Sequence, residues 1–350
     1  MGKNLTIFLF FFTVIAYLSP YVSPAQAWLA GFFSMVIPVL LLLHAFLLAY
    51  YIVQRKKRFL YSLIALLLGY QYLMASFSVS YPSDSVDIPF SVLSYNVRVF
   101  NTYAYLQNEN EPGKAMIDWL ADEDADIKCL QEYYNDKRSS IFNTTTQLES
   151  AGDYSGFVKP NLVNRIGAEF GLATFSRYPM LHQGTIALPD STHFGIYTDL
   201  KIKEDTVRIY NIHLQSMSID ERDLSDLESV RNNYSSVFQK LKHGFVSRAG
   251  QIDHLLEHLN TSPHPVIVCG DFNDLPYSYT YFTLRQWLHN AFERAGNGLG
   301  FSYNGRLFFL RIDNQFYSKS LKAHSFKTIR KINYSDHFPV LTEYTFTKNQ

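Results

Sequence analysis

The sequence predicts a layered α/β domain that follows a membrane anchor of three helices. Residues 1–80 consist almost entirely of three long apolar stretches. From residue 90 onward, short apolar strands alternate with helical segments, and a predicted hairpin lies among them. Strands and helices mixed in this way, with hairpins included, favour helices packed on a partly antiparallel sheet.

The anchor is predicted from the apolar stretches at residues 5–22, 27–53 and 59–79, none of which contains a charged residue. About 20 apolar residues suffice to cross a bilayer as a helix, so each stretch predicts a transmembrane helix. The first could instead be the apolar part of a signal peptide, and all three could be buried helices of a soluble core. Their length and close succession favour three spans. Residues 81–89, with two prolines, indicate a linker between the anchor (residues 1–80) and the domain (residues 90–350).

The orientation of the anchor follows from the basic link at residues 55–58. Basic loops between spans face the cytoplasm, which also places Lys3 on that side. After three crossings, everything beyond residue 81 lies outside the cytoplasm. We therefore expect an integral membrane protein whose folded domain is extracytoplasmic, with the lipid bilayer as its partner and no obligate protein partner.

The charge of the domain limits what it binds. The five charged residues within 1–80 are all basic, so the rest of the chain carries 26 basic and 31 acidic residues, a net charge of −5. A domain of that sign does not attract a long polyanion through bulk charge, although local acidic clusters could hold a cation. The two cysteines, Cys129 and Cys269, lie in apolar strand-like runs and are predicted to be buried free thiols.

The elements of the domain follow in order. Alternating or continuous apolar runs predict strands, and 3.6-residue periodicity predicts helices. Strands are expected at residues 91–97, 127–132, 171–175, 194–203, 206–213, 266–269 and 311–317, with a last segment at 332–340. Helices are expected at 112–122, 220–259 and 279–290, the second interrupted near Gly244, and residues 135–156 read as a loop with a short helix. Residues 204–205 would form the turn of the hairpin.

Polar residues close many of these strand-like runs. They are Asn96, Glu132, His213, Asp271, Asn273, Asp313, Asp336 and His337. One such residue says little, because Asx side chains cap turns and a lone histidine is usually a core or surface residue. Several at successive strand ends can converge on one rim of a sheet, where open α/β folds bind ligands.

The chemistry of this set is that of a hard oxygen site. Carboxylates and an amide oxygen, without a nearby cysteine ligand, suit Mg²⁺ or Mn²⁺ better than Zn²⁺. Mg²⁺ usually keeps several waters and leaves positions for a substrate phosphate. Histidines beside such a metal can donate hydrogen bonds to phosphate oxygens or relay protons.

Seven short motifs in a fixed order make residues 90–347 resemble the endonuclease/exonuclease/phosphatase superfamily, which includes deoxyribonucleases, sphingomyelinases and inositol polyphosphate phosphatases. They are Ser94-Tyr95-Asn96-Val97-Arg98, Leu130-Gln131-Glu132, Thr174-Phe175-Ser176-Arg177-Tyr178-Pro179, Tyr210-Asn211-Ile212-His213-Leu214, Gly270-Asp271-Phe272-Asn273-Asp274, Arg311-Ile312-Asp313 and Ser335-Asp336-His337-Phe338-Pro339-Val340. One departure is Asn314-Gln315-Phe316, where the family usually has an aromatic and then an aliphatic residue.

The resemblance implies a four-layered α-β-β-α sandwich, with two mixed sheets face to face and helices outside. It also implies a hydrolase that cleaves phosphodiesters by in-line attack of an activated water, with Mg²⁺ or Mn²⁺ as cofactor. Asn96 and Glu132 would hold the metal, and Asp336 would act at the metal or at the water.

The remaining site residues would act on the phosphate and the water. Asp271 would orient or deprotonate the water, and Asn273 would contact the phosphate. His337 would donate to a phosphate oxygen, with Asp313 fixing its tautomer. His213 matches the histidine of the deoxyribonuclease and sphingomyelinase branches, across the phosphate from His337. The bland alternative for Asp313 is a surface ion pair with Arg311.

The substrate stays open between two classes. A lipid or other small phosphodiester is slightly favoured, because it reaches a tethered site by diffusion and needs no basic groove. A nuclease would need such a groove, which clusters such as Lys240, Lys242 and Arg248, or Lys327, Arg330 and Lys331, could form. A non-catalytic membrane receptor on a degenerate phosphatase fold is the alternative of another class. The presence of every expected carboxylate and histidine disfavours it.

Overall fold

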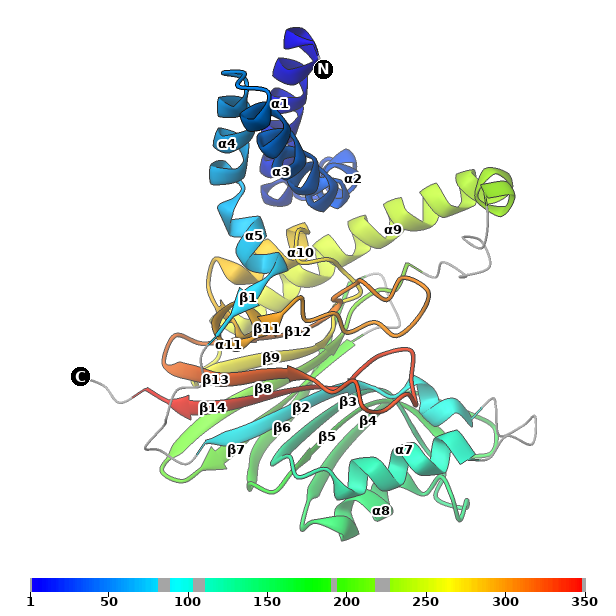
Figure 1. The fold of residues 1–350 in the computed structure, drawn as a ribbon. Helices are drawn as coiled ribbons and strands as arrows, with labels where there is room; N and C mark the ends of the chain where they lie inside the picture. The colour runs from blue at the N-terminus through cyan, green and yellow to red at the C-terminus, as the bar shows by residue number, and fades with distance from the viewer. Residues whose placement is uncertain (1, 81–88, 103–110, 190–193, 218–226, 348–350) are drawn as a thin grey trace.

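The computed structural model describes residues 2–80, 89–102, 111–189, 194–217 and 227–347. A bundle of N-terminal helices stands on one side of a β-sandwich (Figure 1). Nearly all of the predicted linker, and residues 220–226 of the long predicted helix, lie outside the described residues.

The N-terminal bundle is less regular than three unbroken spans. It contains α1 (Lys3–Leu18), which a 3₁₀ turn extends (η1, Ser19–Tyr21), then α2 (Leu29–Met35), α3 (Ile37–Val53), α4 (Phe59–Leu68) and α5 (Tyr70–Ser76). Among the described residues, only the helix Lys3–Tyr21 is by itself long and apolar enough to cross a membrane. The pairs α2/α3 and α4/α5 bend by 41° and 64°, and they raise the number of candidate spans to three if each pair counts as one.

The breaks that correct this expectation have local causes. A proline stands in the first turn of α3, where its missing N–H and its ring prevent a continuous helix from α2. Gly69 separates α4 from α5. Polar side chains bridge the bundle, since Thr13 Oγ1 lies 2.9 Å from His44 Nε2 and Thr6 Oγ1 lies 2.8 Å from Tyr51 Oη.

The sandwich consists of two mixed sheets, as the family resemblance implies, and each has six strands. The strand orders are β13-β14-β2-β3-β5-β4 and β10-β12-β9-β8-β7-β6. The first contains β2 (Phe90–Asn96), β3 (Ile127–Asn135), β4 (Ser155–Val163), β5 (Glu169–Ser176), β13 (Leu321–Thr328) and β14 (Val340–Phe346). The second contains β6 (Met180–Ala187), β7 (Phe194–Ile202), β8 (Asp205–His213), β9 (Val266–Asp271), β10 (His289–Asn290) and β12 (Asp313–Tyr317). The pairs β2/β3 and β8/β9 are parallel, and the other pairs are antiparallel.

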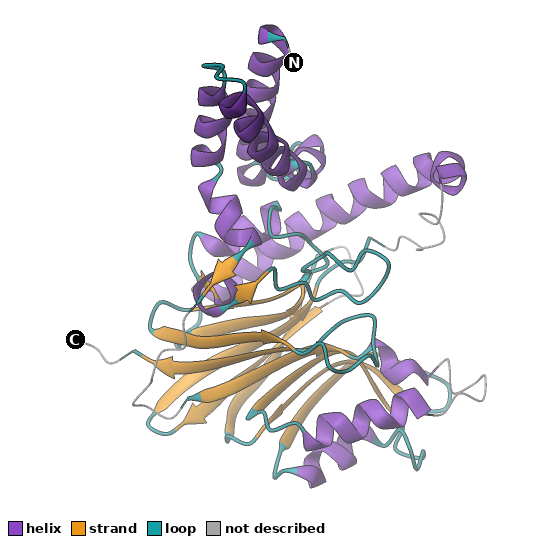
Figure 2. Ribbon diagram, viewed as in Figure 1, coloured by secondary structure: helices purple, strands orange, loops and turns teal. Residues whose placement is uncertain are grey.

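Helices cover the outer faces of both sheets (Figure 2). α7 (Glu111–Asp122) and α8 (Thr144–Ala151) lie on the first sheet, and α9 (Leu227–Asn260) and α10 (Tyr279–Arg285) lie on the second. α11 (Ala291–Ala295) and a two-stranded pairing of β1 (Ser78–Val79) with β11 (Asn297–Gly298) lie near the end of α5. The core between the sheets includes Ile209, Ile267 and both cysteines, which are buried and free as predicted.

Several predicted boundaries are wrong. α9 continues through Gly244, because a glycine within a 34-residue helix costs only about 1 kcal/mol of helix stability. A larger residue would be crowded there, since a Cβ at position 244 would lie 2.9 Å from the Arg248 guanidinium. The helix expected at 279–290 ends at Arg285. Strand β14 begins where the segment predicted at 332–340 ends, and strands β4, β6 and β13 were not predicted.

Candidate functional site

Strand pairing brings the predicted site residues to one edge of the sandwich. In the parallel pair β8/β9, His213 stands opposite Asp271. In the antiparallel pair β12/β9, Asp313 stands opposite Asp271. In the facing sheet, β2 ends at Asn96, and β3 has an irregular register between Leu130 and Tyr133. The two sheets therefore meet at this edge through the side chains of Asn96 and Asp271.

Asp271 stands at the centre of the site and is only 1% exposed. Its Oδ2 accepts a hydrogen bond from Asn96 Nδ2 at 3.0 Å and lies 3.6 Å from both His213 Nε2 and His337 Nε2. Its Oδ1 accepts from the backbone N–H of Asn273 at 2.8 Å. One carboxylate oxygen thus faces an amide and two imidazoles that come from three separate segments of the chain.

His337 and Asp313 form the dyad that the sequence suggests. His337 Nδ1 lies 2.9 Å from Asp313 Oδ2, and the backbone N–H of Asp313 donates to Ser302 Oγ at 3.0 Å. Burial alone would lower the pKa of His337, but the nearby carboxylates of Asp313 and Asp271 raise it to about 10. Burial raises the pKa of Asp313, against the opposing charge of His337.

The alternative for Asp313, a surface ion pair with Arg311, is wrong in this structure. Arg311 is 2% exposed, and its guanidinium donates to the carbonyl oxygen of Ala75 at 2.6 Å and covers the Phe292 ring at 3.9 Å. Arg311 therefore contacts the N-terminal bundle, and the Asp313 carboxylate pairs with His337 instead. With Nδ1 engaged, the Nε2 side of His337 faces the centre of the site.

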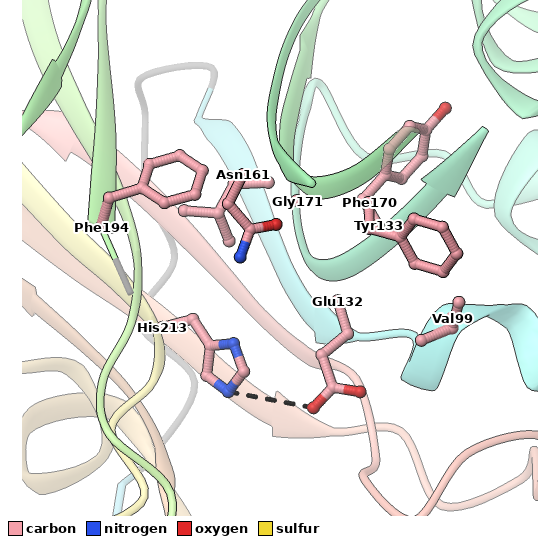
Figure 3. Close-up of a pocket in the computed structure, with 9 residues that line it drawn as sticks. Val99, Glu132, Tyr133, Asn161, Phe170, Gly171, Phe194 and His213 are labelled. Atoms are coloured by element: carbon pink, nitrogen blue, oxygen red, sulfur yellow. Dashed lines mark ion pairs between the residues drawn. The ribbon is translucent and has the colours of Figure 1, made fainter. Parts of the chain in front are cut away.

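Glu132 and His213 border a pocket of about 170 Å³ (Figure 3). Glu132 Oε1 lies 3.9 Å from His213 Nε2 and accepts a hydrogen bond from Asn96 Nδ2 at 3.2 Å. The other lining residues are largely apolar or neutral: Val99, Tyr133, Asn161, Phe170, Gly171, Leu172 and Phe194. The pocket thus joins an end lined by Glu132 and His213 to a neutral wall.

A left-handed turn follows Asn96. Arg98, Val99, Phe100 and Asn101 all have positive φ, between 45° and 54°. This conformation is costly for residues other than glycine, and it is typically kept where the surroundings hold a functional position. No glycine marks the turn, so it could not be predicted from the residue types.

The oxygen donors fit a hard divalent cation. Asn96 Nδ2 stands between the carboxylates of Glu132 and Asp271, at a position where two negative charges favour a positive neighbour. Asp271, Asp313 and His337 form a second, fully buried group whose ligand atoms lie within 4.8 Å of one another. A metal in that second group would compete with the His337–Asp313 hydrogen bond, so Glu132, Asp271 and Asn96 fit a cation better.

The side chains of two predicted site residues have their polar partners outside this centre. Asp336 pairs with Arg98 at 3.6 Å and accepts a hydrogen bond from Ser335 Oγ at 3.2 Å. The side chain of Asn273 donates to the carbonyl oxygen of Leu214 at 3.0 Å. The metal role of Asp336 and the phosphate role of Asn273 both stay predictions.

A polar layer beneath the site was missed by the sequence analysis. Gln131 Nε2 donates to Asn211 Oδ1 at 2.6 Å, and Asn211 Nδ2 donates to the carbonyl oxygens of Leu130 and Ala173 at 3.2 and 2.9 Å. These bonds join the two sheets just below Glu132 and His213. Their place in the sequence could have indicated them, because both lie inside the family-like motifs. Gln131 directly precedes Glu132, and Asn211 lies two residues before His213.

The sandwich is similar to several solved structures, which show the fold. The catalytic domain of human Nocturnin with bound sulfate is 20% identical, with a TM-score of 0.52 over 75% of this chain and 97% of that chain. An endonuclease/exonuclease/phosphatase family protein from Bacteroides thetaiotaomicron is 18% identical (TM-score 0.53, 77% of this chain, 100% of that one). A humanized D. rerio TDP2 is 17% identical (TM-score 0.53, 73% and 99%).

Family comparisons divide the chain as the structure does. No curated protein matches the sequence. Residues 4–76 match a domain of unknown function. Residues 93–337, which include every predicted site residue, match the family described as Endonuclease/Exonuclease/phosphatase. This match covers more than half of the sequence, and the chain therefore belongs to the endonuclease/exonuclease/phosphatase family.

Proposed function

We propose that this protein is a membrane-anchored, divalent-metal-dependent phosphoester hydrolase that activates a water for in-line attack. The observation that carries the proposal is the setting of Asp271, whose Oδ2 faces Asn96, His213 and His337 together. Family membership supports the general chemistry, since the family consists of enzymes that hydrolyse phosphoesters.

Asn96 and Glu132 would hold Mg²⁺ or Mn²⁺, and Asp336, which pairs with Arg98 at 3.6 Å, would act at the metal or at the water. When bound, the cation supplies positive charge that neutralises the phosphate and stabilises the developing oxyanion. Asp271 orients the water and accepts its proton through the carboxylate oxygen that faces the histidines. Because this carboxylate is buried, its own hydrogen bonds fix its orientation before substrate arrives.

The two histidines approach Asp271 Oδ2 from the end of β8 and from the segment before β14, and they would bind the phosphate from opposite sides. His337, protonated and fixed through Nδ1 by Asp313, donates from Nε2 to a phosphate oxygen. His213 donates from the Glu132 side of the site. Asn273 adds a contact to the phosphate.

The N-terminal helices would anchor the domain, which covers residues 90–350, in the bilayer through the three apolar stretches of residues 1–80. The outward face of the bundle is apolar, with Leu42 73% and Leu67 67% exposed, while His44 and Thr13 are buried. The chain start and the basic link lie at the end of the bundle away from the sandwich (Figure 1). By the positive-inside rule this end is cytoplasmic and the domain extracytoplasmic.

A lipid or small phosphodiester is the proposed substrate class, in preference to nucleic acid. The net charge of −5 beyond residue 80 gives no bulk attraction for a polyanion. The neutral, partly aromatic wall of the pocket beside Glu132 suits an uncharged organic group.

Side-by-side hydrolysis assays on the full chain test the proposal. DNA, sphingomyelin and phosphoinositides are offered with Mg²⁺ or Mn²⁺, and then with EDTA, with Asp271→Asn as the matched inactive control. We expect turnover of a lipid substrate that EDTA and the substitution both abolish. Binding without turnover would favour the non-catalytic receptor, and turnover that survives exhaustive EDTA would disprove the metal requirement.

A further inference from the structure

Helix α9 is longer than the sheet it covers. It has 34 residues and therefore spans about 50 Å at about 1.5 Å per residue. Ile252 and Leu255 in its C-terminal half pack into the core against the second sheet. Its N-terminal half projects past the sandwich and runs crosswise to the helices of the bundle, at the end of the bundle nearest the sandwich (Figure 1).

The projecting half has one apolar side. At about 100° per residue, Tyr234, Val237, Phe238, Leu241 and Phe245 fall within a stripe about 100° wide. Ser235, Ser236, Gln239 and His243 occupy the opposite side. A helix that projected only into water would gain nothing from such a stripe.

The stripe begins on the anchor and continues beyond it. The ring of Phe245 meets Phe32 with centroids 5.2 Å apart, and the ring of Phe238 stacks on Phe32 at 4.8 Å and meets Trp28 at 5.6 Å. One turn further out, Tyr234 is 69% exposed. Phe245 is 4% and Phe238 37% exposed, so α2 covers the inner end of the stripe, and the outer end continues past the bundle uncovered.

Two lysines lie at the margins of this face. Lys242 Nζ lies 5.0 Å above the Trp28 ring, and Lys240 follows the polar side on the opposite margin. Lysines in such positions can lie along apolar surface while their ammonium groups reach lipid phosphates. Trp28 itself is a residue type that favours the membrane interface.

We propose that residues 234–245 of α9 lie in the headgroup region of the bilayer and hold the catalytic domain against the membrane surface. This inference rests on the proposed membrane anchor. Lipid is the occupant, in preference to a second copy of the chain, because the stripe is continuous with the anchor helices and lysines flank it. The catalytic domain is thereby fixed by two elements, the bundle and α9, which limits its rotation relative to the bilayer.

Depth-dependent quenching in the full-length protein tests this inference. Single cysteines are introduced by Tyr234→Cys, by Leu42→Cys on the outer face of α3, and by Glu257→Cys at the far end of α9, where the side chain is 80% exposed. The native cysteines are buried and stay unlabelled. The variants carry an environment-sensitive fluorophore and are reconstituted in nanodiscs of phosphatidylethanolamine and phosphatidylglycerol, with or without bromine on the upper acyl chain.

We expect brominated lipid to reduce the fluorescence at positions 42 and 234 and to leave that at position 257 unchanged. Quenching at 42 with none at 234 would overturn the inference and leave the anchor intact. No quenching at 42 would overturn the anchor and the inference with it. If the fluorophore at position 234 reports an apolar environment only in discs that hold two chains, the stripe is covered by a second copy of the chain, and the inference is overturned.

As a second variant, Phe238→Asp places a charge in the stripe. It should abolish the loss of fluorescence at position 234 while position 42 stays quenched. Hydrolytic activity on a soluble substrate checks that this variant is folded, since residue 238 lies outside the catalytic site. Unchanged quenching at 234 in a folded variant would overturn the inference.

Discussion

The N-terminal bundle and the sandwich are built in opposite ways. The bundle exposes large apolar side chains, such as Leu42 and Val53, which are 73% and 79% exposed, and buries His44 completely. The sandwich buries apolar side chains such as Ile209 and Ile267 between its sheets and gathers its functional charges at one edge. The difference is the one that the proposed anchor requires, because apolar side chains on the outside are stable in lipid and polar ones are stable in water.

The two parts nevertheless share a packed boundary. Phe282 of α10 meets Tyr72 and Tyr21 at centroid distances of 5.1 and 5.5 Å, and the Tyr277 hydroxyl lies 2.7 Å from Ser76 Oγ. Arg311, two residues before Asp313, donates to the carbonyl oxygen of Ala75. The N-terminal bundle therefore packs against the segment that carries Asp313.

The largest expected effect is all-or-none and concerns the two surroundings themselves. A reporter enzyme that is active only outside the cytoplasm, fused after Gln350, should be active. The basic link places the start of the chain in the cytoplasm, and the three apolar stretches then give three crossings. The same fusion made to a reporter that works only in the cytoplasm is the control and should be silent. The reverse result, with both fusions stably expressed, would mean that the first stretch is not a span or that the positive-inside rule fails here.

Substitutions of His337 and Asp313 should lower the turnover of the sandwich domain and leave the fold of the bundle unchanged. His337→Ala removes a transition-state contact and should lower turnover by about 10²–10³-fold. Asp313→Asn should cost less, because the ring remains but is poorly oriented. The measurement is turnover of the two single variants and the double variant on one substrate.

Non-additivity is the decisive outcome of this cycle. Two groups that act as one unit lose far less together than the product of their single losses. Asp136→Asn, a substitution in the loop after β3, serves as the matched acidic control and should leave turnover unchanged. Fully additive losses in the double variant would mean that Asp313 and His337 act separately.

The packed boundary can be tested with Phe282→Ala. The Phe282 side chain projects from α10 and is buried against the bundle. Its truncation should therefore lower the free energy of unfolding of the full chain by about 3–5 kcal/mol. A truncated protein of residues 81–350 lacks the bundle, and there the same substitution should cost clearly less. Denaturant unfolding of all four proteins measures the difference. Equal costs would show that the bundle adds nothing to this contact.

The smallest expected effect concerns a buried charge in the sandwich. Burial lowers the pKa of Lys128 from 10.5 to about 8, although its ammonium donates to the carbonyl oxygen of Leu120 and lies over the Tyr154 ring. The unfolded chain therefore binds more protons than the folded one between about pH 8 and 10.5, so stability due to this group should rise across that range.

Lys128→Met should flatten this rise. The penalty of burying the charged form is fully present below about pH 8, so the difference between wild type and variant should change by about 1–2 kcal/mol between pH 8 and 10.5. Unfolding free energies at several pH values measure it. Lys322→Met, at an exposed position of β13, is the control and should show no such change. Parallel curves for wild type and Lys128→Met would contradict the prediction.

The sequence by itself determined the mixed α/β class, the apolar stretches and the strands that carry Asn96, Glu132, His213 and Asp271. These strands are apolar runs buried on both sides, and burial on both sides leaves a strong pattern. Strand β4 was missed because most of its residues are exposed or half-buried at the edge of its sheet, which leaves a weak pattern. The helix breaks before Ile37 and after Leu68 were missed because an apolar stretch gives its length but not its direction.

Only the tertiary structure decided which polar residues meet. Asp271 and Asp313 are 42 positions apart and become neighbours through the register of β9 and β12. The partner of Arg311 is a backbone carbonyl of the bundle, and a carbonyl carries no sequence signal. The left-handed turn at Arg98–Asn101 and the neutral wall of the pocket likewise depend on contacts between distant strands. The local pattern of apolar residues shows which side chains are buried. The geometry of the site depends on strand register and on packing between layers, because these are properties of pairs of segments and not of any one segment.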